Sequence, residues 1–389
     1  MEGRATLALI GLRVAYAYNW FDLGPGLTGV SSTFGVGPAE WGVLLAAFLV
    51  GAGAFQVPAG LLAKRLGPRT VALWGAFLLG AGGLAAAAAP TFLTLVILRA
   101  AAGAGAALFF SPAIGLVARL QPEGRRGVAV GTFSSAFSAG AALGVFVTSL
   151  VIPLIGWRGG LALGGGLLLA LLAIAVPLVP SRGAADSEPA SRGLPAALRS
   201  RAVWAIGLAF IGLEGASLSA GQYFVPYAEV VRGWAPALAG AVASLFVFPS
   251  LFGGPVGGAL TERYTNRRTQ MVIATAAAGA LLLAVPFAGV GPVAGVAIAF
   301  SLSYGAIYAM MYVLAPYLPG IPRSEVPLAI GLFNSIQIVG GALLTYLFAI
   351  FVSTRGYTDA WLALGVLTVV PIGLLILVPA TGAHPSSGG

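Results

Sequence analysis

The chain has 389 residues, of which 59% are hydrophobic and 8% charged, and its mean hydropathy is +0.97. Soluble domains carry roughly 25% charged residues, so most of this surface is expected to face a lipid bilayer. In a membrane protein the formal net charge of +9 does not indicate nucleic-acid binding, and the positions of the charges along the chain matter more than their sum. With no cysteine and one histidine, His384 in the polar tail, the chain excludes disulfides, thiolate metal sites and Cys or His catalysis.

Twelve apolar runs are long enough to cross a hydrocarbon core, which takes about 20 residues. The first starts at Ala5 and lacks a cleavage site followed by a soluble domain, so it predicts a retained helix rather than a signal peptide. The runs are 5–31, 39–62, 69–89, 92–118, 127–153, 159–179, 202–228, 235–260, 269–290, 293–318, 327–353 and 359–379.

One long polar stretch, 180–201, divides these runs into six and six. Its Pro, Gly, Ser and mixed charges are typical of a surface linker. The sequence thus predicts an all-α membrane protein with a six-helix bundle over 1–179, a cytoplasmic linker over 180–201, and a second six-helix bundle with a short polar tail over 202–389.

Basic residues are distributed unequally between the two sets of loops. One set holds most of them, including Arg4, Lys64 and Arg126, whereas the other holds only Arg158, Arg232 and Arg355. The positive-inside rule then predicts a multi-pass protein of the cell membrane with both termini in the cytoplasm. The basic loops are more simply determinants of this orientation than a ligand site.

The two halves resemble each other at a nearly constant offset, which indicates an internal repeat. Shifted by 198, Pro38, Ala39, Gly42, Phe48, Gly60, Arg65 and Arg69 meet Pro236, Ala237, Gly240, Phe246, Gly258, Arg263 and Arg267. Shifted by 202, Pro90 and Gly103 meet Pro292 and Gly305; shifted by 200, Ala129, Gly131, Phe133, Ser135 and Gly140 meet Ala329, Gly331, Phe333, Ser335 and Gly340. Six spans per repeat give both halves the same sense in the membrane, which predicts a pseudo-two-fold axis along the membrane normal and a substrate path between the halves.

The loop after the second span begins at Gly60 and carries Lys64, Arg65, Gly67 and Arg69; the copy after the eighth span has Gly258, Glu262, Arg263, Arg267 and Arg268. The fourth span has Arg99 and Gly103, and Gly156-Trp157-Arg158 precedes the sixth. In their order and spacing these motifs resemble the major facilitator superfamily of secondary transporters, over the whole chain. The resemblance implies that spans 1, 4, 7 and 10 line a central cavity, and that Gly60, Lys64, Arg65, Arg69, Gly258, Glu262, Arg263 and Arg267 belong to a cytoplasmic gate motif.

Two positions depart from patterns of that family. Members usually carry Asp where this chain has Lys64, so the gate pairing that the resemblance implies for the first half is in doubt, whereas Glu262 keeps the acid in the second copy. Drug-exporting antiporters of the family have a Gly-Pro signature in the fifth span. Here Gly140 and Gly144 fit but the Pro is absent, which weakens an export hypothesis.

Charged residues inside spans are costly and usually functional, and there are four clear cases here. Arg13 and Asp22 fall in span 1, Arg99 in span 4 and Glu214 in span 7. Asp22 lies ~25 Å from the start of its span and Arg99 ~10 Å below the opposite surface, depths that are compatible with a contact between them.

Each of these charges has a structural as well as a functional interpretation. Asp22 either neutralises Arg99, sits at the interface as a helix-end charge, or carries a proton. Arg99 either serves as its structural partner or, as the family resemblance implies, contacts substrate or the coupling machinery. Arg13 is an interfacial anchor or a second substrate ligand. Glu214, near mid-depth, is the best candidate for a proton carrier, because burial favours the neutral form of a carboxylic acid.

Polar and aromatic side chains flank these charges and are candidate substrate ligands: Tyr16 and Asn19 in span 1, Gln222 and Tyr223 in span 7, and Tyr304 and Tyr308 in span 10. Tyr304, Tyr308 and Tyr312 share one helical face, a stripe that serves packing as readily as binding. Asn334, Gln337 and Gln56 are weaker candidates.

Two functions are compatible with this pattern. The first is proton-coupled transport or exchange of a small organic or inorganic anion, such as a carboxylate, by alternating access, with Arg99 and Arg13 neutralising the anion and Glu214 or Asp22 carrying the proton. The alternative is a proton-coupled exporter of hydrophobic or cationic compounds. A sensor of the same fold ranks third, and an enzyme last, since the chain has no nucleotide loop, metal cluster or nucleophile–base pair. The expected partners are a small-molecule substrate, protons and lipid, with no cofactor, metal or nucleic acid, and the expected state is a monomer.

Overall fold

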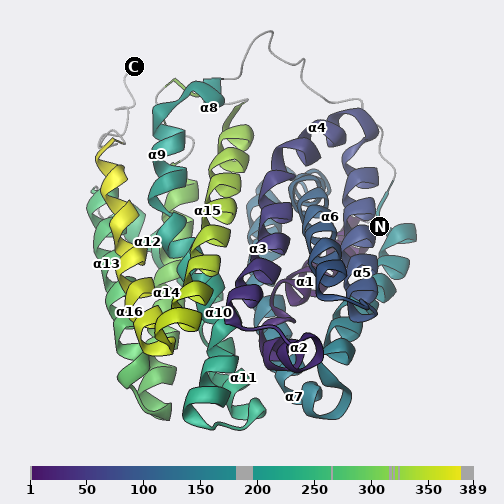
Figure 1. Ribbon diagram of the computed structural model, residues 1–389. Helices are drawn as coiled ribbons and strands as arrows, with labels where there is room; N and C mark the ends of the chain where they lie inside the picture. The colour runs from purple at the N-terminus through teal and green to yellow at the C-terminus, as the bar shows by residue number, and fades with distance from the viewer. Residues whose placement is uncertain are drawn as a thin grey trace.

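The computed structural model describes residues 2–180, 196–263, 266–314, 318, 320–322 and 325–377, and within them all regular structure is helical. The side chains of residues 123, 261–263, 267, 312–314 and 326–327 also lie outside the description. Figure 1 shows two groups of helices standing side by side, α1 to α7 on one side and α8 to α16 on the other. We call the end of the molecule that holds α8 the upper end, and the end that holds α2 and α11 the lower end.

The N-terminal half follows the order expected from its apolar runs, and proline and glycine mark its boundaries. Gly35 ends one helix with φ 67°, and Pro38 and Pro68 stand in the first turns of the helices that they open, where a missing N–H costs nothing. The elements are α1 (Glu2–Phe21), η1 (Gly24–Gly26), α2 (Leu27–Phe34), α3 (Pro38–Ala54), α4 (Gln56–Leu66), α5 (Pro68–Ala87), α6 (Phe92–Arg119) and α7 (Glu123–Leu178).

The C-terminal half repeats this order after the short helix α8 (Ala196–Arg199), the only described helix within the predicted linker, most of which lies outside the described residues. The Ser200 side chain accepts the Val203 N–H and caps the next helix. The elements are α9 (Arg201–Ala209), α10 (Ile211–Arg232), α11 (Pro236–Ser244), α12 (Ser250–Arg263), α13 (Arg267–Ala284), η2 (Val285–Phe287), α14 (Val290–Leu314), α15 (Val326–Arg355), α16 (Tyr357–Val369) and η5 (Val370–Leu377).

Within the described residues, eight helical segments are long and apolar enough to cross a membrane when α9 and α10 are counted together, or nine if α3 and α4, bent by 43°, form one span. This number is lower than the twelve predicted spans because the chain turns or breaks locally in the remaining ones. α7 contains two predicted spans, since the backbone turns at Gly156, whose φ of 68° suits glycine. The first predicted span is divided by Gly24-Pro25-Gly26 into α1 and α2, and the eighth by a turn that ends at Pro249 into α11 and α12.

The two halves meet along two helix pairs. α3 packs lengthwise on α15, where Gly42 lies against Ala349 and Gly53 against Val339, and the Ser335 hydroxyl donates to the Gly53 carbonyl at 2.7 Å. α7 packs on α11, where Gly240 lies against Ser149. Small residues allow this close approach in a medium that supplies no hydrophobic force between helices.

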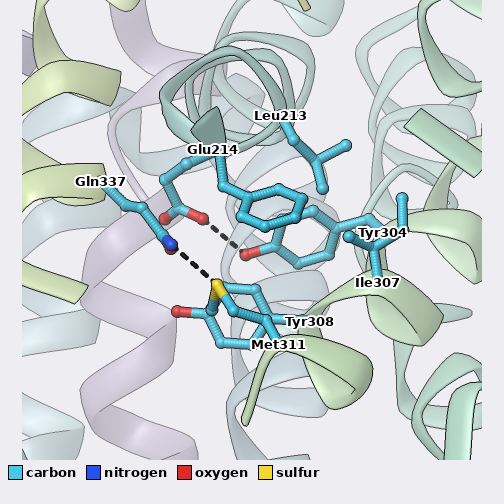
Figure 2. A pocket seen from close by; sticks show the side chains of 8 residues that line it. Leu213, Glu214, Tyr304, Ile307, Tyr308, Met311 and Gln337 are labelled. Carbon is cyan, nitrogen blue, oxygen red and sulfur yellow. Dashed lines mark hydrogen bonds between the residues drawn. The ribbon is translucent and has the colours of Figure 1, made fainter. Parts of the chain in front are cut away.

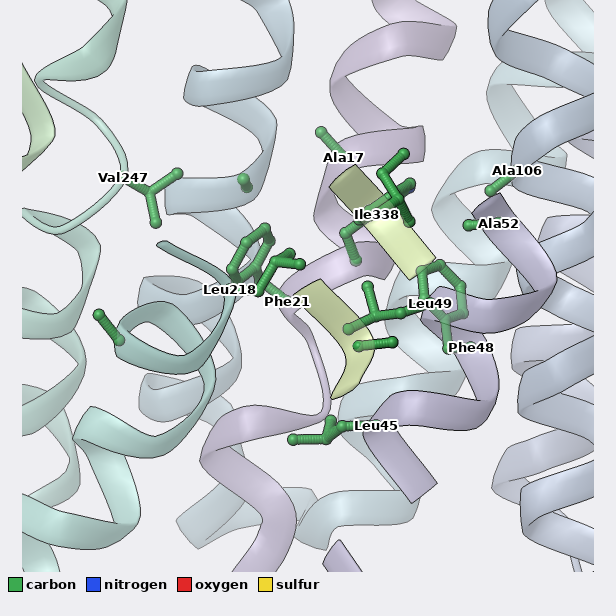
Figure 3. Packing of buried hydrophobic residues seen from close by; sticks show 14 of the residues in the cluster. Ala17, Phe21, Leu45, Phe48, Leu49, Ala52, Ala106, Leu218, Val247 and Ile338 are labelled. Atoms are coloured by element: carbon green, nitrogen blue, oxygen red, sulfur yellow. The ribbon is translucent and has the colours of Figure 1, made fainter. Parts of the chain in front are cut away.

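Near the middle of the molecule the interface between the halves is closed by apolar side chains. Ala17 and Phe21 of α1 lie in one packed cluster with Leu218 of α10 and Ile338 of α15, and Leu45 and Leu49 of α3 complete it (Figure 3). We call these six residues the apolar plug. On its lower side the Gln222 amide donates to the Trp20 carbonyl at 2.6 Å, which ties α10 to α1.

Candidate functional site

Asp22 and Arg99 form a buried ion pair inside the N-terminal half. The Arg99 Nη1 to Asp22 Oδ1 distance is 3.3 Å, and the two side chains are 1% and 0% exposed. Arg99 also donates to the Asn19 carbonyl at 3.2 Å and lies over the Phe48 ring, 4.5 Å from its centroid. Asp22 and Arg99 are thus in contact, as their depths in the membrane allowed, and the Arg99 guanidinium has further partners within the protein.

Close packing surrounds this pair on the side of α5 and α7. A Cβ added to Gly164 would lie 2.9 Å from Asp22 Oδ2, and one added to Gly83 would lie 3.0 Å from Asn19 Oδ1. The Asn19 amide donates to the carbonyls of Ala15 and Gly164 at 2.8 and 3.0 Å. The site residues Asp22 and Asn19 thus lie within the bundle, and their donors and acceptors cross-link α1 to α6 and α7.

Arg13 occupies a different environment, a cage of aromatic rings. Its guanidinium carbon lies 4.5 Å from the ring centroid of Tyr16, 4.4 Å from that of Phe110, 5.4 Å from that of Phe133 and 4.8 Å from that of Phe137. These rings come from α1, α6 and α7, and the Arg13 side chain is buried. An arginine stacked among rings keeps its charge while shedding much of its water, which suits recognition of a carboxylate.

Glu214 holds the corresponding place in the C-terminal half. The break at Phe210 between α9 and α10 puts it in the first turn of a new helix, where the positive end of the helix dipole favours a carboxylate. The Tyr304 hydroxyl of α14 donates to Glu214 Oε2 at 2.8 Å (Figure 2). Glu214 is 7% exposed, so protein atoms rather than water surround its side chain.

A narrow crevice, too tight to hold a water molecule, adjoins Glu214 and is lined by Tyr304, Tyr308, Met311 and Gln337 among others (Figure 2). The Tyr308 hydroxyl donates to Asn334 Oδ1 at 2.6 Å, and the Gln337 amide to the Met311 sulfur at 2.8 Å. A site that binds a small molecule must enclose far more space than this, so the Glu214 crevice is closed in this conformation.

The remaining candidate ligands lie elsewhere. Gln222 ties the two halves together below the apolar plug, and the Tyr223 hydroxyl donates to the Thr345 carbonyl at 3.3 Å while its ring stacks on Phe348, 4.9 Å between centroids. Neither lies in the Arg13 cage or lines the Glu214 crevice. As ligands, both stay predictions.

Of the predicted gate motif, Arg69 has the clearest role. Its guanidinium donates to the carbonyls of Val179 and Val176 at 2.7 and 2.8 Å and so caps the end of α7. Gly60, Lys64 and Arg65 lie on α4, at the upper end, and Gly258 lies on α12. The side chains of Glu262, Arg263 and Arg267 lie outside the described residues.

The internal repeat relates the Arg13 cage to the Glu214 crevice. The offset that pairs Ala17 with Leu218, both in the apolar plug, also pairs Arg13 with Glu214. At the offsets of the other spans, Phe109 and Phe137 correspond to Met311 and Gln337. The rings of Phe110, Phe133 and Phe137 were not among the sequence candidates, because nothing along α6 or α7 shows which face turns toward α1.

Comparisons with known proteins agree with this architecture. The family model described as the Major Facilitator Superfamily matches residues 9–345. The human Monocarboxylate transporter 11 is 28% identical over 358 residues, which cover 84% of this chain and 72% of that protein. A bacterial homolog of the human lysosomal transporter Spinster, in an inward-facing and occupied conformation, has the same fold with a TM-score of 0.77 at 16% identity, over 98% of both chains.

Two further relatives match over shorter segments. The 4-hydroxybenzoate transporter PcaK of Pseudomonas aeruginosa is 32% identical over 158 residues, covering 41% of this chain and 35% of that protein. The Methylenomycin A resistance protein of Streptomyces coelicolor is 34% identical over 179 residues, covering 44% of this chain and 36% of that protein. These two matches span about a third of each relative, so the family rests on the model match, which covers most of the chain. The protein is a multi-pass membrane transporter and belongs to the Major Facilitator Superfamily.

Proposed function

We propose that this transporter carries a small organic anion, a monocarboxylate, together with a proton, by alternating access of a site between its halves. The observation that carries the proposal is the Arg13 guanidinium enclosed by the rings of Tyr16, Phe110, Phe133 and Phe137. A cation surrounded by apolar faces can pair with the carboxylate of a ligand whose hydrocarbon part packs on the same rings.

Arg13 replaces Arg99 as the first candidate for the anion-binding group. The Arg99 guanidinium already pairs with the Asp22 carboxylate, so a ligand anion there would have to displace an anionic partner, whereas the contacts described above for the Arg13 guanidinium are with aromatic rings. Arg13 lies one helical turn above Ala17 of the apolar plug, on the same face of α1. The named relatives that transport a monocarboxylate or 4-hydroxybenzoate support this substrate class.

Glu214 is the proposed proton site. Its carboxyl is buried, receives one hydrogen bond from Tyr304, and lies one turn above Leu218 of the apolar plug. A proton on Glu214 would offset the charge that is lost when the carboxylate neutralises Arg13, so anion and proton would favour the same occluded state. In this proposal the halves are 1–179 and 202–389, joined by the linker 180–201, and both termini face the cytoplasm.

The test is uptake of labelled benzoate or lactate into liposomes that contain the purified protein, with an inward proton gradient. Arg13→Gln is expected to lose about 2–5 kcal/mol of ligand binding, a loss of roughly 30-fold or more in affinity. Arg4→Gln, which removes an exposed arginine from the same helix, is the matched control and is expected to transport normally.

A result in which Arg13→Gln folds and still takes up carboxylates at the wild-type rate would overturn the proposal. One relative is named as a methylenomycin A resistance protein, so the same liposomes also test the second candidate function, the export of hydrophobic or cationic compounds. If hydrophobic cations exchange for protons in the same liposomes, and carboxylates do not, the export of such compounds replaces anion transport as the function.

A further inference from the structure

The internal repeat places opposite charges at equivalent positions of the two halves. Arg13 of α1 and Glu214 of α10 correspond at the same offset as Ala17 and Leu218. Each side chain is 7% exposed, and each is surrounded by residues of the first, fourth and fifth spans of its own half. A pseudo-two-fold axis between the halves thus relates a cationic subsite to an anionic one.

Both charges lie on the same side of the apolar plug. Residues four apart lie on one face of a helix, so Arg13 shares a face with Ala17, and Glu214 shares one with Leu218. Ala17 and Leu218 belong to the apolar plug in which the two halves meet (Figure 3). A Cβ on Gly341 of α15 would lie 3.2 Å from both the Glu214 Cγ and the Leu218 Cδ1, which confirms that these two side chains share a face. The charges therefore stand on opposite sides of the axis, one turn above the apolar plug.

The Glu214 subsite has the groups that recognise an ammonium ion. The carboxylate accepts charge-assisted hydrogen bonds, and the rings of Tyr304 and Tyr308, 5.4 Å apart between centroids, offer π faces beside it. The Arg13 subsite has the complementary chemistry for a carboxylate. A proton is the smallest cation that Glu214 can accept, and a protonated amine is a larger one.

We propose that the preferred substrates are amino-substituted carboxylates, bound with the carboxylate on Arg13 and the ammonium on Glu214. This inference rests on the proposed function, since it assigns the anionic end of the ligand to the same Arg13 cage. It adds that the ligand contacts both halves at once, so that binding itself draws the halves together around the axis.

The two ligand types must differ in their need for a proton. A plain carboxylate neutralises Arg13 and leaves Glu214 to take a proton, whereas an ammonium group pairs with ionised Glu214 and competes with that proton. Among the described residues, the other titratable groups that line the Glu214 crevice are Tyr304 and Tyr308 of α14, and α15 contributes the neutral Gln337. Plain carboxylates should therefore bind more tightly as the pH falls, and amino-carboxylates less tightly.

The experiment is calorimetric titration of the purified protein with a matched pair, para-methylbenzoate and para-(aminomethyl)benzoate, and with the shorter pair butyrate and gamma-aminobutyrate. Titrations at about pH 5.5 and about pH 7.5 change the proton concentration about a hundredfold. At the higher pH one amino ligand is expected to bind roughly 10- to 100-fold more tightly than its plain partner, the usual effect of a hydrogen bond to a charged group. Glu214→Gln, which resembles the protonated carboxyl, is expected to abolish this advantage and to bind the plain carboxylate at both pH values about as tightly as the wild type does at about pH 5.5.

Each failure identifies its own source. If plain carboxylates bind and depend on Arg13, but neither amino ligand gains affinity, or the gain survives Glu214→Gln, the two-ended site is wrong and anion transport stands. If neither ligand type depends on Arg13, the proposed function itself fails. The opposite pH trends are measured on the wild-type protein alone, so parallel trends would overturn the two-ended site even if Glu214→Gln did not fold.

Discussion

In the N-terminal half a buried ion pair, Asp22 with Arg99, braces the first and fourth spans; at the equivalent positions the C-terminal half has Tyr223 and Ser301. There the Tyr223 hydroxyl donates to the Thr345 carbonyl, and the Ser301 hydroxyl accepts the Ser250 N–H at 2.9 Å. The same scaffold is thus completed by an ion pair in one half and by neutral hydrogen bonds in the other. The fold therefore does not require an ion pair at these positions. The role of each buried charge has to be inferred from its other contacts.

The two halves share the glycines at which helix backbones approach each other most closely. A Cβ on Gly103 of α6 would collide with the Phe48 carbonyl of α3, and a Cβ on Gly305 of α14 would collide with the Ser250 carbonyl of α12. The repeat therefore preserves the close helix contacts and varies the polar side chains. The shared glycines set the framework, and the pairs Arg13/Glu214 and Asp22/Tyr223 distinguish the two halves chemically.

The largest effect is expected from filling these shared contacts. Gly103→Val and Gly305→Val each force two helix backbones apart, so each should cost more than about 4 kcal/mol and prevent isolation of a monodisperse protein. Yield and gel filtration in detergent measure the outcome. Gly115→Val and Gly295→Val lie on the same two helices with nothing within 4 Å of the added Cβ, and are the matched controls. Equal behaviour of the two pairs would contradict the packing role.

The next effect tests the ion pair. Arg99→Gln leaves the Asp22 carboxylate buried without its cation, a change that typically costs about 3–5 kcal/mol. Asp22→Asn combined with Arg99→Gln removes both charges, as the C-terminal half has done, and should regain most of the lost melting temperature. The double variant should still bind carboxylates. Loss of binding in a stable double variant would return the anion site to Arg99.

The sequence predicted the framework well and the side-chain environments only in part. Apolar run lengths located the passages through the membrane, because a bilayer imposes one length on every span. The breaks at Phe210 and between Leu245 and Pro249 were not predicted, since the packing around an apolar run decides whether it bends. The contact between Asp22 and Arg99 followed from depth, whereas the rings around Arg13 depend on the rotation of α6 and α7, which composition does not reveal.

A smaller effect separates the two tyrosines of the Glu214 crevice. Tyr304 donates to a carboxyl, whereas Tyr308 donates to the Asn334 amide oxygen. Hydrogen bonds to charged groups contribute about 1.5–3 kcal/mol and neutral ones about 1 kcal/mol, so Tyr304→Phe should lower the melting temperature more than Tyr308→Phe. In the Glu214→Gln background this difference should vanish, which a double-mutant cycle measures. A difference that persists there would mean that Glu214 is not the charged partner.

The smallest effect concerns the hydrogen bond between the halves below the apolar plug, which the Gln222 amide donates to the Trp20 carbonyl. Opening the lower end must break this bond, so Gln222→Leu removes stabilisation from the closed state alone, about 1 kcal/mol or roughly a fivefold shift of population. Because the chain has no cysteine, Ala17→Cys introduces a single thiol into the apolar plug, and its labelling rate by a membrane-impermeant reagent added to the lower side reports the opening. Gln270→Leu, which loses a bond to the Leu260 carbonyl within one half, should leave that rate unchanged. If the introduced thiol is labelled equally fast in both variants, the bond between the halves does not bias the opening, and the apolar side chains of the plug set the equilibrium instead.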